Sequence, residues 1–420
     1  MAALAAWREA CESIADYDPP AMSPTTPTTP TRIAAIDWMR GLVMILMAVD
    51  HASIFWNGGR LAADSAYLLD PDAGGPLWIP GTPLDTLQFY TRWVTHLCAP
   101  TFLFLSGTSL AMSFEKRRGQ GLREVDFDRH LLIRAAVIFA CEGILSAMSG
   151  MGAPFLQVLF AIGASMMAMV LLRRLPTTIL VVLGLGWLIG SEWVLTQFFP
   201  IMASTGELAG GAPDRSVLEL LFFTAGAKGS LLVFYPMTHW LAMMLLGWAF
   251  GRSLLARPDN KKGQEDTEKL LLLSGLTAML LWAFIRSKNG YGNLGLLRDD
   301  TTIVQWLHMS KYPPSLVFSL MELGLMALLL LVFMRFERGM KGAARHNNPL
   351  LVFGQTPLFF YMGHIIMLSA AAVVWTGGIG LRDLSETYIA AGITVAVFYP
   401  ICIGYRALRA KHPKSLLQYF

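Results

Sequence analysis

The sequence predicts an all-α polytopic membrane protein, with about ten transmembrane helices in one bundle and both termini in the cytoplasm. Three observations lead to this fold class. Only 15% of the 420 residues are charged and 54% are hydrophobic, whereas soluble domains carry about 25% charged residues. Apolar runs of about 20 residues, long enough to cross a bilayer, recur along the chain. Basic side chains are concentrated in alternate connections between these runs.

The expected spans follow the apolar runs in order. The third and fourth are separated only by residues 149–153, so we expect a tight helical hairpin there. Residues 217–224 are apolar but too short to span, which predicts a re-entrant or interfacial helix. The predicted spans cover residues 33–57, 89–114, 129–150, 154–172, 176–196, 231–251, 268–287, 315–335, 350–375 and 386–408.

The loop charges predict the orientation. One set of connections and the C-terminal tail hold roughly twenty Lys and Arg residues against eight in the opposite set, a clear positive-inside bias. The net charge of +4 belongs to these loops and does not suggest a nucleic-acid partner. The long connections 58–88, 197–230 and 288–314 then lie on the outer side. Long ordered loops usually carry function, so we expect an acceptor to bind there.

Three segments are expected. Residues 1–31, with a Ser, Thr and Pro run, predict a disordered N-terminal tail. Residues 32–410 form the transmembrane domain, and residues 411–420 form a cytoplasmic tail. The four cysteines lie far apart, without the spacing of metal ligands, so neither a metal site nor a disulfide framework is expected.

The first span carries Asp50 and His51 deep in its apolar segment. An ionisable residue at the centre of a bilayer costs about 2.5–3.5 kcal/mol even on lenient insertion scales. Two adjacent titratable groups therefore predict a functional site. The simpler alternative is a polar pair that joins helices or lines a water pocket.

Helix geometry places further titratable groups at a similar depth. With a rise of 1.5 Å per residue, His51 and His96 lie roughly 9 Å from the outer helix ends, and Glu142 roughly 12 Å. His364 lies slightly deeper. If the four helices face one another, these side chains build a polar cavity in which a histidine is a general base. Asp50 points about 100° away from His51 on a helix, so we expect it to orient His96 or a backbone group.

The chain has no nucleophile signature, which favours single displacement or a histidine that carries the group itself. Other polar residues have simpler explanations. His239 is expected at a helix start near the interface, and His130 on a solvated face. The small-residue pattern of Gly247 and Gly251 permits close helix packing, either within one bundle or between the subunits of a homodimer.

Several motifs, in order along the chain, resemble those of the heparan-α-glucosaminide N-acetyltransferase-like proteins, one branch of the transmembrane acyltransferase superfamily. The resemblance covers most of residues 32–408, and two of its motifs, RWVTHLCAP and SKYPPSL, are specific. The motifs are Asp37-x-x-Arg40-Gly41, Met47-x-x-Asp50-His51, RWVTHLCAP at 92–100, Tyr235-Pro236 with Gly247-x-x-x-Gly251, SKYPPSL at 310–316, and FGQTPLFFY at 353–361 followed by His364.

The resemblance implies an enzyme that moves an acyl group, usually acetyl from cytoplasmic acetyl-CoA, to a hydroxyl or amine of a glycan or glycolipid on the other side of a bacterial inner membrane. No metal is implied. Its catalytic residues are then His51 or His96 as base or acyl carrier, oriented by Asp50, Glu142 and His364. The implied donor-binding residues are Asp37, Arg40 and Arg92, and the acceptor-binding residues are Lys311, Tyr312 and Tyr361.

Other interpretations stay open at this point. The same intramembrane His, Asp and Glu residues suit the proton relay of a proton-coupled transporter or flippase. A third possibility is an inactive scaffold of an envelope complex. Arg40 has its own alternative, as a positive-inside anchor at the cytoplasmic face.

Overall fold

The computed structural model describes residues 33–60, 84–148, 154–198, 216–257, 260–340, 346–413 and 415–420. The predicted N-terminal tail and the predicted turn 149–153 lie outside the described residues. The chain forms two compact units. Unit 1 comprises Met1–Asn57 and Phe333–Phe420, and unit 2 comprises Gly58–Val332.

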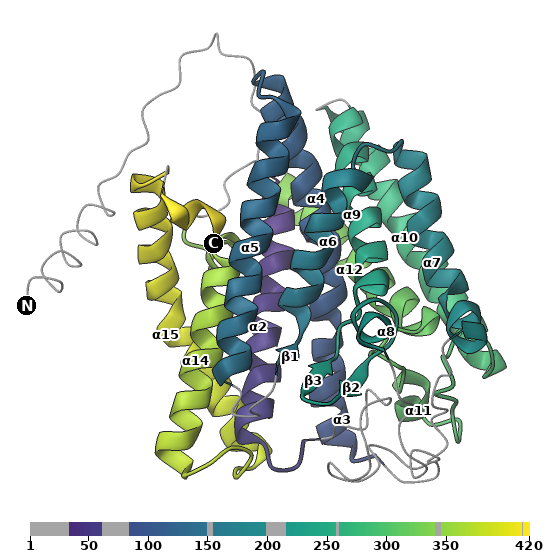
Figure 1. Cartoon of the computed structure of the whole chain (residues 1–420), viewed down its shortest axis with the longest axis vertical. Coiled ribbons are helices and arrows are strands. Elements are labelled where there is room, and N and C mark those ends of the chain that lie inside the picture. The colour runs from purple at the N-terminus through teal and green to yellow at the C-terminus, as the bar shows by residue number, and fades with distance from the viewer. Residues whose placement is uncertain are drawn as a thin grey trace, which may run out of the picture. The chain divides into compact units, whose positions relative to one another are not determined.

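Among the described residues, eight helices are long and apolar enough to cross a membrane, which confirms the all-helical polytopic class (Figure 1). Two of the predicted spans are not among them. The predicted span 154–172 begins as strand β1 (Phe155–Leu156) and continues as α6 (Val158–Leu172), which has only 15 residues. The eight are α2 (Ala34–Trp56), Thr86–Gly119, α5 (Glu124–Met148), α7 (Thr177–Phe198), α10 (Lys261–Lys288), α12 (Leu316–Gly339), α14 (Pro357–Thr376) and α15 (Leu384–Lys411).

The other predicted span, 231–251, also begins as a strand. Strand β3 (Leu231–Val233) pairs in parallel with β1 and antiparallel with β2 (Gly226–Lys228), which makes a small three-stranded sheet that the apolar pattern did not predict. The helix α9 (Met237–Ala256) starts directly after Pro236, the residue at its N-cap. The predicted short helix at 217–224 is found as α8 (Val217–Phe222).

In unit 1, α2 packs against α13 (Pro349–Gln355) at backbone contact. A Cβ on Gly354 would lie 1.8 Å from the carbonyl oxygen of Asp37, and a Cβ on Gly41 would lie 1.9 Å from that of Leu350. Only glycine fits at these two positions. Gly41 of the Arg40-Gly41 motif and Gly354 of the Phe353-Gly354 motif therefore face each other's helices, and the close approach explains the glycine in each motif.

Further contacts hold both ends of α2 in unit 1. The carboxylate of Glu337, in the last turn of α12, accepts hydrogen bonds from Ala34 N and Ala35 N at 2.7 and 3.0 Å. An anion at this position satisfies helix N–H groups that have no partner within the helix. Near the other end, Ala52 of α2 forms an apolar cluster with Leu368 of α14 and Ala390 of α15.

The predicted span 350–375 is broken into α13 and α14 at Thr356. Pro357 has no backbone N–H, and its ring disfavours the helical conformation of the preceding residue. Accordingly, Thr356 has φ −127° and ψ 40°. The break starts a new helix, α14, seven residues before His364.

In unit 2, α9 packs in parallel against α4 (Cys98–Gly119). A Cβ on Gly247 would lie 1.9 Å from the carbonyl oxygen of Phe104, and one on Gly107 would lie 2.1 Å from that of Met244. Thr108 adds an interhelical hydrogen bond to the carbonyl of Gly247 at 3.0 Å. The Gly247-x-x-x-Gly251 pattern therefore serves packing within one chain, the first of the two alternatives.

The helix before α4 is interrupted. Residues Thr86–Trp93 form α3, residues Val94–Leu97 form the 3-10 helix η3, and α4 follows without a loop. Pro100 cannot donate to the carbonyl of His96 four residues earlier, so regular α-helical bonding fails there. The chain tightens into a 3-10 turn instead, and that turn carries His96.

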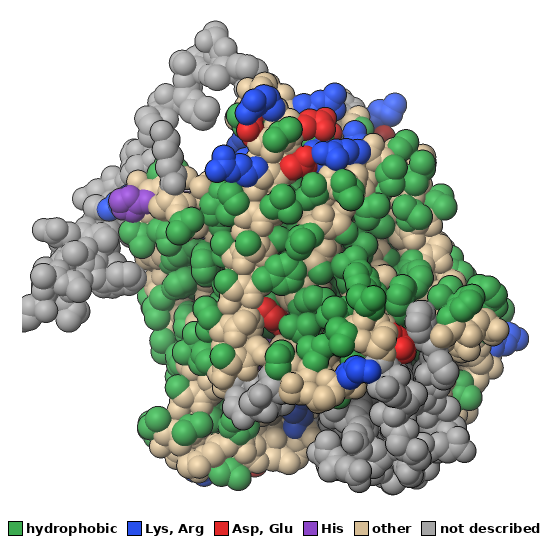
Figure 2. Space-filling view, viewed as in Figure 1, with side chains coloured by type: hydrophobic (Ala, Val, Ile, Leu, Met, Phe, Trp, Pro, Cys, Tyr) green, Lys and Arg blue, Asp and Glu red, His purple; other side chains and the backbone are tan. Residues whose placement is uncertain are grey.

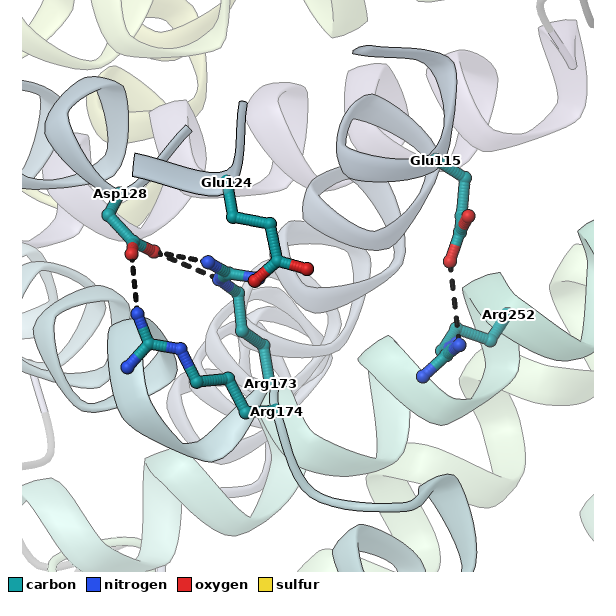
Figure 3. A network of polar contacts seen from close by, with 6 residues as sticks. All are labelled: Glu115, Glu124, Asp128, Arg173, Arg174 and Arg252. Atoms are coloured by element: carbon teal, nitrogen blue, oxygen red, sulfur yellow. Dashed lines mark hydrogen bonds and ion pairs between the residues drawn. The ribbon is translucent and has the colours of Figure 1, made fainter. Parts of the chain in front are cut away.

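Ion pairs join the helix ends at one end of unit 2 (Figure 3). The buried guanidinium of Arg173 lies 2.6 Å from Asp128 of α5, and Arg174 contacts the other oxygen of Asp128 at 2.7 Å. Arg252 of α9 pairs with Glu115 of α4 at 3.5 Å. In Figure 2, charged side chains gather where α4 ends and α5 begins, and hydrophobic side chains cover the adjoining helix surfaces.

A single buried arginine organises the loop that follows α10. Arg286 donates to five oxygen acceptors in residues 293–308 and is fully buried. The side-chain amide oxygen of Asn293 accepts at 2.5 Å and the carbonyl of His308 at 2.5 Å. The remaining acceptors are the carbonyls of Leu296, Gln305 and Trp306.

Candidate active site

Two of the predicted histidines form a hydrogen-bonded pair in unit 1. His51 Nδ1 on α2 lies 2.6 Å from His364 Nε2 on α14. The two rings are stacked, with centroids 4.9 Å apart and an interplanar angle of 20°. Both side chains are buried. The first span and the ninth predicted span thus meet at the histidines, as the depth argument expects.

The backbone determines which nitrogen of each ring carries the proton. His364 Nδ1 lies 2.6 Å from the carbonyl oxygen of Phe360, which can only accept, so Nδ1 of His364 is protonated. In the neutral ring, Nε2 of His364 is then the acceptor, and His51 donates to it from Nδ1. Nε2 of neutral His51 therefore carries the lone pair of a general base.

Aromatic side chains surround this pair. The Tyr361 ring stands edge-on to His51, with centroids 5.4 Å apart, and the Phe360 ring stacks on His364 at 4.7 Å. Of the residues predicted for the site, His51, His364 and Tyr361 are thus brought together within unit 1, and Asp50 precedes His51 on α2.

The predicted donor-binding pair Asp37 and Arg40 has contacts of its own at the start of α2. Arg40 Nη1 donates to the Asp37 carboxylate at 2.9 Å and to the carbonyl of Gly354 at 3.0 Å. These bonds join α2 to α13 where the two backbones touch. The contacts give Arg40 a part in helix packing, and both of its predicted roles, in donor binding and as a positive-inside anchor, stay predictions.

His96 lies in unit 2, in the 3-10 turn before α4, and is fully buried. Its ring packs against Phe318 of α12, with centroids 5.6 Å apart. On the same face of α12, one turn further on, lies Glu322. His96 is therefore held beside the N-terminal half of α12.

Two of the three predicted acceptor residues, Lys311 and Tyr312, lie near Arg92 in unit 2, whereas the third, Tyr361, lies beside His51 in unit 1. Arg92 Nη2 donates to the hydroxyl of Tyr312 at 3.4 Å, and the hydroxyls of Tyr312 and Tyr235 are 3.3 Å apart. Lys311 Nζ lies 5.2 Å from the centre of the Tyr312 ring. The structure thus groups Arg92, predicted for the donor, with two of the residues predicted for the acceptor.

Glu142 has a different setting from that of the histidines. Its carboxylate accepts a hydrogen bond from Gln157 N, and the backbone N–H groups of Leu159 and Phe160 also act on it. These groups belong to the first turn of α6, whose N-cap residue makes no side-chain cap. Glu142 therefore caps α6, a structural role that the depth argument did not predict.

Glu322 and His239 are buried titratable residues outside the predicted site. Glu322 is only 1% exposed, and no predicted site included it. A carboxylate in the apolar run of residues 316–332 is the same signal that singled out Asp50. His239 lies in the first turn of α9, which confirms the predicted helix start, and it is fully buried against the Trp187 ring at 5.5 Å; its depth at the membrane interface stays a prediction.

The four-residue layer divides between the units. His51 and His364 meet in unit 1, whereas His96 and Glu142 belong to unit 2. A single cavity built by all four stays a prediction.

The fold and these side chains define a class, that of multi-pass integral membrane proteins. Histidine and carboxylate side chains are buried between its helices. Residues 79–284 match the family model described as heparan-alpha-glucosaminide N-acetyltransferase, catalytic. The resemblance drawn from the motifs is thereby confirmed over this segment, a little under half of the chain. The family implies a membrane acetyltransferase that uses acetyl-CoA, with a glycan as acceptor. A comparison with curated proteins finds no match.

The matched segment divides the predicted residues. Arg92, His96 and Glu142 lie inside it, whereas His51 and His364 lie outside. The matched segment lies within unit 2. It includes Tyr235 and the packed glycines of α4 and α9.

Proposed function

We propose that this protein is an acetyl-CoA-dependent acyltransferase of a bacterial inner membrane that acetylates a hydroxyl or amine of a glycan or glycolipid on the outer side. The observation that carries the proposal is the match of residues 79–284 to an acetyltransferase catalytic region. The charge bias of the loops supports cytoplasmic termini and about ten crossings, with α6 and α9 in addition to the eight candidate spans.

The chemistry needs a base. His51 or His96 accepts the proton of the acceptor hydroxyl or amine while the acceptor oxygen or nitrogen bonds to the acetyl carbon. The bond from that carbon to sulfur breaks, and the histidine returns the proton to the CoA thiolate. The tautomer of the His51–His364 pair supports His51 as base, because Nε2 carries the lone pair. The position of His96 in the matched segment supports the second choice.

The described residues fit the donor's charge. CoA carries phosphates, and basic side chains, with acidic ones among them, gather at the end of unit 2 where α4 ends and α5 begins (Figure 2). Arg174 is half-exposed there. Guanidinium groups bind phosphate oxygens with paired hydrogen bonds, so this end suits the donor.

The test uses purified protein in nanodiscs with radiolabelled acetyl-CoA. Loss of the acetyl group, and label on the protein, are measured for the wild type, His51→Ala, His96→Ala and the exposed control His412→Ala. Turnover that disappears in one of the first two variants, and persists in the control, identifies the base. Label retained on the wild-type protein identifies a histidine that carries the acetyl group.

No binding and no turnover of acetyl-CoA by the folded wild type would contradict the proposal. That outcome favours the proton-coupled transporter, in which the buried histidines relay protons.

A further inference from the structure

Two arginines near the end of α15 bind the residue at which α13 ends. Arg409 Nη2 donates to the main-chain carbonyl of Gln355 at 2.9 Å, and Arg406 Nη1 donates to the side-chain oxygen of Gln355 at 3.2 Å. Gln355 is the last residue of α13, two residues before α14 begins. One neighbouring helix therefore holds both the backbone and the side chain at this point of unit 1.

Each of the two guanidinium groups makes further hydrogen bonds within unit 1. Arg406 also donates to the carbonyl of His346 at 2.9 Å and to the side-chain oxygen of Asn347 at 2.8 Å. Arg409 also donates to the carbonyl of Phe420 at 3.2 Å. A basic side chain at the C-terminal end of a helix is favourable without any specific partner. Arg406, however, spans α13 from the residues before its start to its last residue, so its bonds fix the placement of that short helix.

Aromatic contacts continue the attachment of α15 along α14 towards His364. The Phe359 ring stacks on Tyr405 of α15, with centroids 4.0 Å apart. The Phe360 ring meets Phe398 of α15 edge-on at 5.5 Å and stacks on the ring of His364 at 4.7 Å. α15 therefore reaches His364 through a single intervening ring.

The start of α14 decides where His364 points. Each residue of an α-helix turns the chain by about 100° and advances it by about 1.5 Å, so a shift of the start by one residue would swing the ring away from His51. The hydrogen bond of 2.6 Å between His51 Nδ1 and His364 Nε2 does not survive such a shift. Thr356, the N-cap residue of α14, makes no side-chain cap. The bonds from α15 to Gln355 therefore help to fix this start.

We propose that Arg406 and Arg409 are positioning residues for His364. By holding Gln355, they set the start of α14 and keep His364 against His51. The inference rests on the proposed function with His51 as the base, and it goes beyond that function by giving α15 a part in the reaction. Neither arginine lies in the matched segment 79–284.

The position of the histidines is measured first, without any turnover, on the full chain in nanodiscs. Histidines are labelled with diethyl pyrocarbonate, and mass spectrometry of the peptides gives the rate at each residue. Because His51 and His364 are buried and bonded to each other, we expect slow labelling of both in the wild type. The variant that carries both Arg406→Met and Arg409→Met should label severalfold faster at these two residues and at the wild-type rate at His96 of unit 2. Unchanged rates at His51 and His364, or an equal rise at His96, overturn the proposal.

A milder pair of variants decides the question if the double variant does not fold. Gln355→Leu removes only the side-chain acceptor of Arg406, whereas Gln355→Glu keeps an oxygen at the same place. We expect faster labelling of His51 and His364 in Gln355→Leu than in Gln355→Glu. Equal labelling in the two variants contradicts the proposed role of Arg406.

Kinetics with radiolabelled acetyl-CoA then separates positioning from a merely structural role. The double variant and Gln355→Leu should lower kcat by about 10- to 100-fold, because a displacement of about 1 Å has a cost of this size, and should leave the KM for acetyl-CoA unchanged. Gln355→Glu should lose much less. The matched control is Arg382→Met, since the guanidinium of Arg382 pairs with Glu386 at 3.5 Å at the other end of α15, and it should keep the wild-type kcat.

Wild-type kcat in the double variant, or a raised KM for acetyl-CoA with kcat unchanged, overturns the proposal. Failure of the proposed function has a different signature. The wild type would then consume no acetyl-CoA, while the labelling of His51 and His364 would still respond to the arginine variants.

Discussion

At the scale of the residue, the hydrogen bond between His51 and His364 is the contact with the clearest chemical consequence. The carbonyl of Phe360 orients the proton on His364, and His364 in turn orients the proton on His51. Second partners of this kind position a catalytic imidazole in other enzymes, where their loss lowers turnover strongly. The same logic gives His364 the role of a positioning residue if His51 is the base.

The prediction concerns His364→Phe, which removes the acceptor for His51 Nδ1 and keeps a ring of similar size. If His51 is the base, we expect kcat for acetyl transfer to fall about 100-fold or more. His364→Gln, whose amide oxygen can accept, should lose less. Steady-state kinetics on purified protein checks the expected order of kcat, with the wild type highest, His364→Gln next and His364→Phe lowest. Wild-type kcat in the Phe variant would remove His51 from the mechanism.

A second residue-scale prediction concerns Arg286. Replacing it with Met leaves five buried oxygen acceptors without their donor, each of which costs about 1–3 kcal/mol when unsatisfied. We therefore expect Arg286→Met to lower the free energy of unfolding by about 3 kcal/mol or more. The neighbouring exposed Lys288→Met should change it by at most about 0.5 kcal/mol. Equal Tm values for the two variants in detergent would show that Arg286 does not organise this loop.

At the scale of the element, small residues decide how helices pair. α4 and α9 approach so closely that a Cβ on Gly247 would lie within 1.9 Å of a backbone carbonyl of the partner helix. In α7, by contrast, no atom of the described residues outside the neighbouring turns of the helix lies within 4 Å of a Cβ built on Gly190. The two glycines therefore predict opposite effects of the same substitution.

Gly247→Ala is expected to force α4 and α9 apart and lower Tm, because backbone cannot give way as a flexible side chain does. Gly190→Ala is expected to leave Tm unchanged or raise it, since alanine favours the helix by roughly 0.5–1 kcal/mol over glycine. Thermal unfolding of both variants in one detergent is the measurement. A smaller loss for Gly247→Ala than for Gly190→Ala would refute the packing argument.

At the scale of the whole molecule, the donor provides a test that depends on no single residue. An acetyl-CoA-dependent enzyme is stabilised by its donor through mass action, by about 2.7 kcal/mol at a concentration 100 times its Kd. We expect acetyl-CoA to raise Tm in proportion to the logarithm of its concentration. A transporter with no donor site would show no such dependence.

The orientation of the chain is the other property at this scale. The positive-inside bias predicts that both termini face the cytoplasm. A green fluorescent protein fused after Phe420 should therefore fluoresce in cells, and an alkaline phosphatase fused at the same position should be inactive. Active phosphatase would reverse the orientation, and with it the side assigned to the acceptor.

The sequence by itself determined the class of protein, most of the helices long enough to cross a membrane, and the family resemblance that the match over residues 79–284 confirms, because long apolar runs and local motifs do not depend on distant contacts. It also singled out His51, His96 and His364, since an ionisable group in an apolar run is visible one residue at a time. The pattern of hydropathy could not show that residues 154–172 and 231–251 begin as paired strands, because that pairing joins segments far apart in the chain.

Only the tertiary structure decided which side chains meet. Geometry along single helices placed Glu142 with the histidines, yet its carboxylate faces the free N–H groups of α6. Arg92 was assigned to the donor by resemblance, yet it bonds to Tyr312, 220 residues away. Depth along a helix follows from counting residues, whereas the direction of a side chain around the helix, and the partner it reaches, depend on how the helices pack.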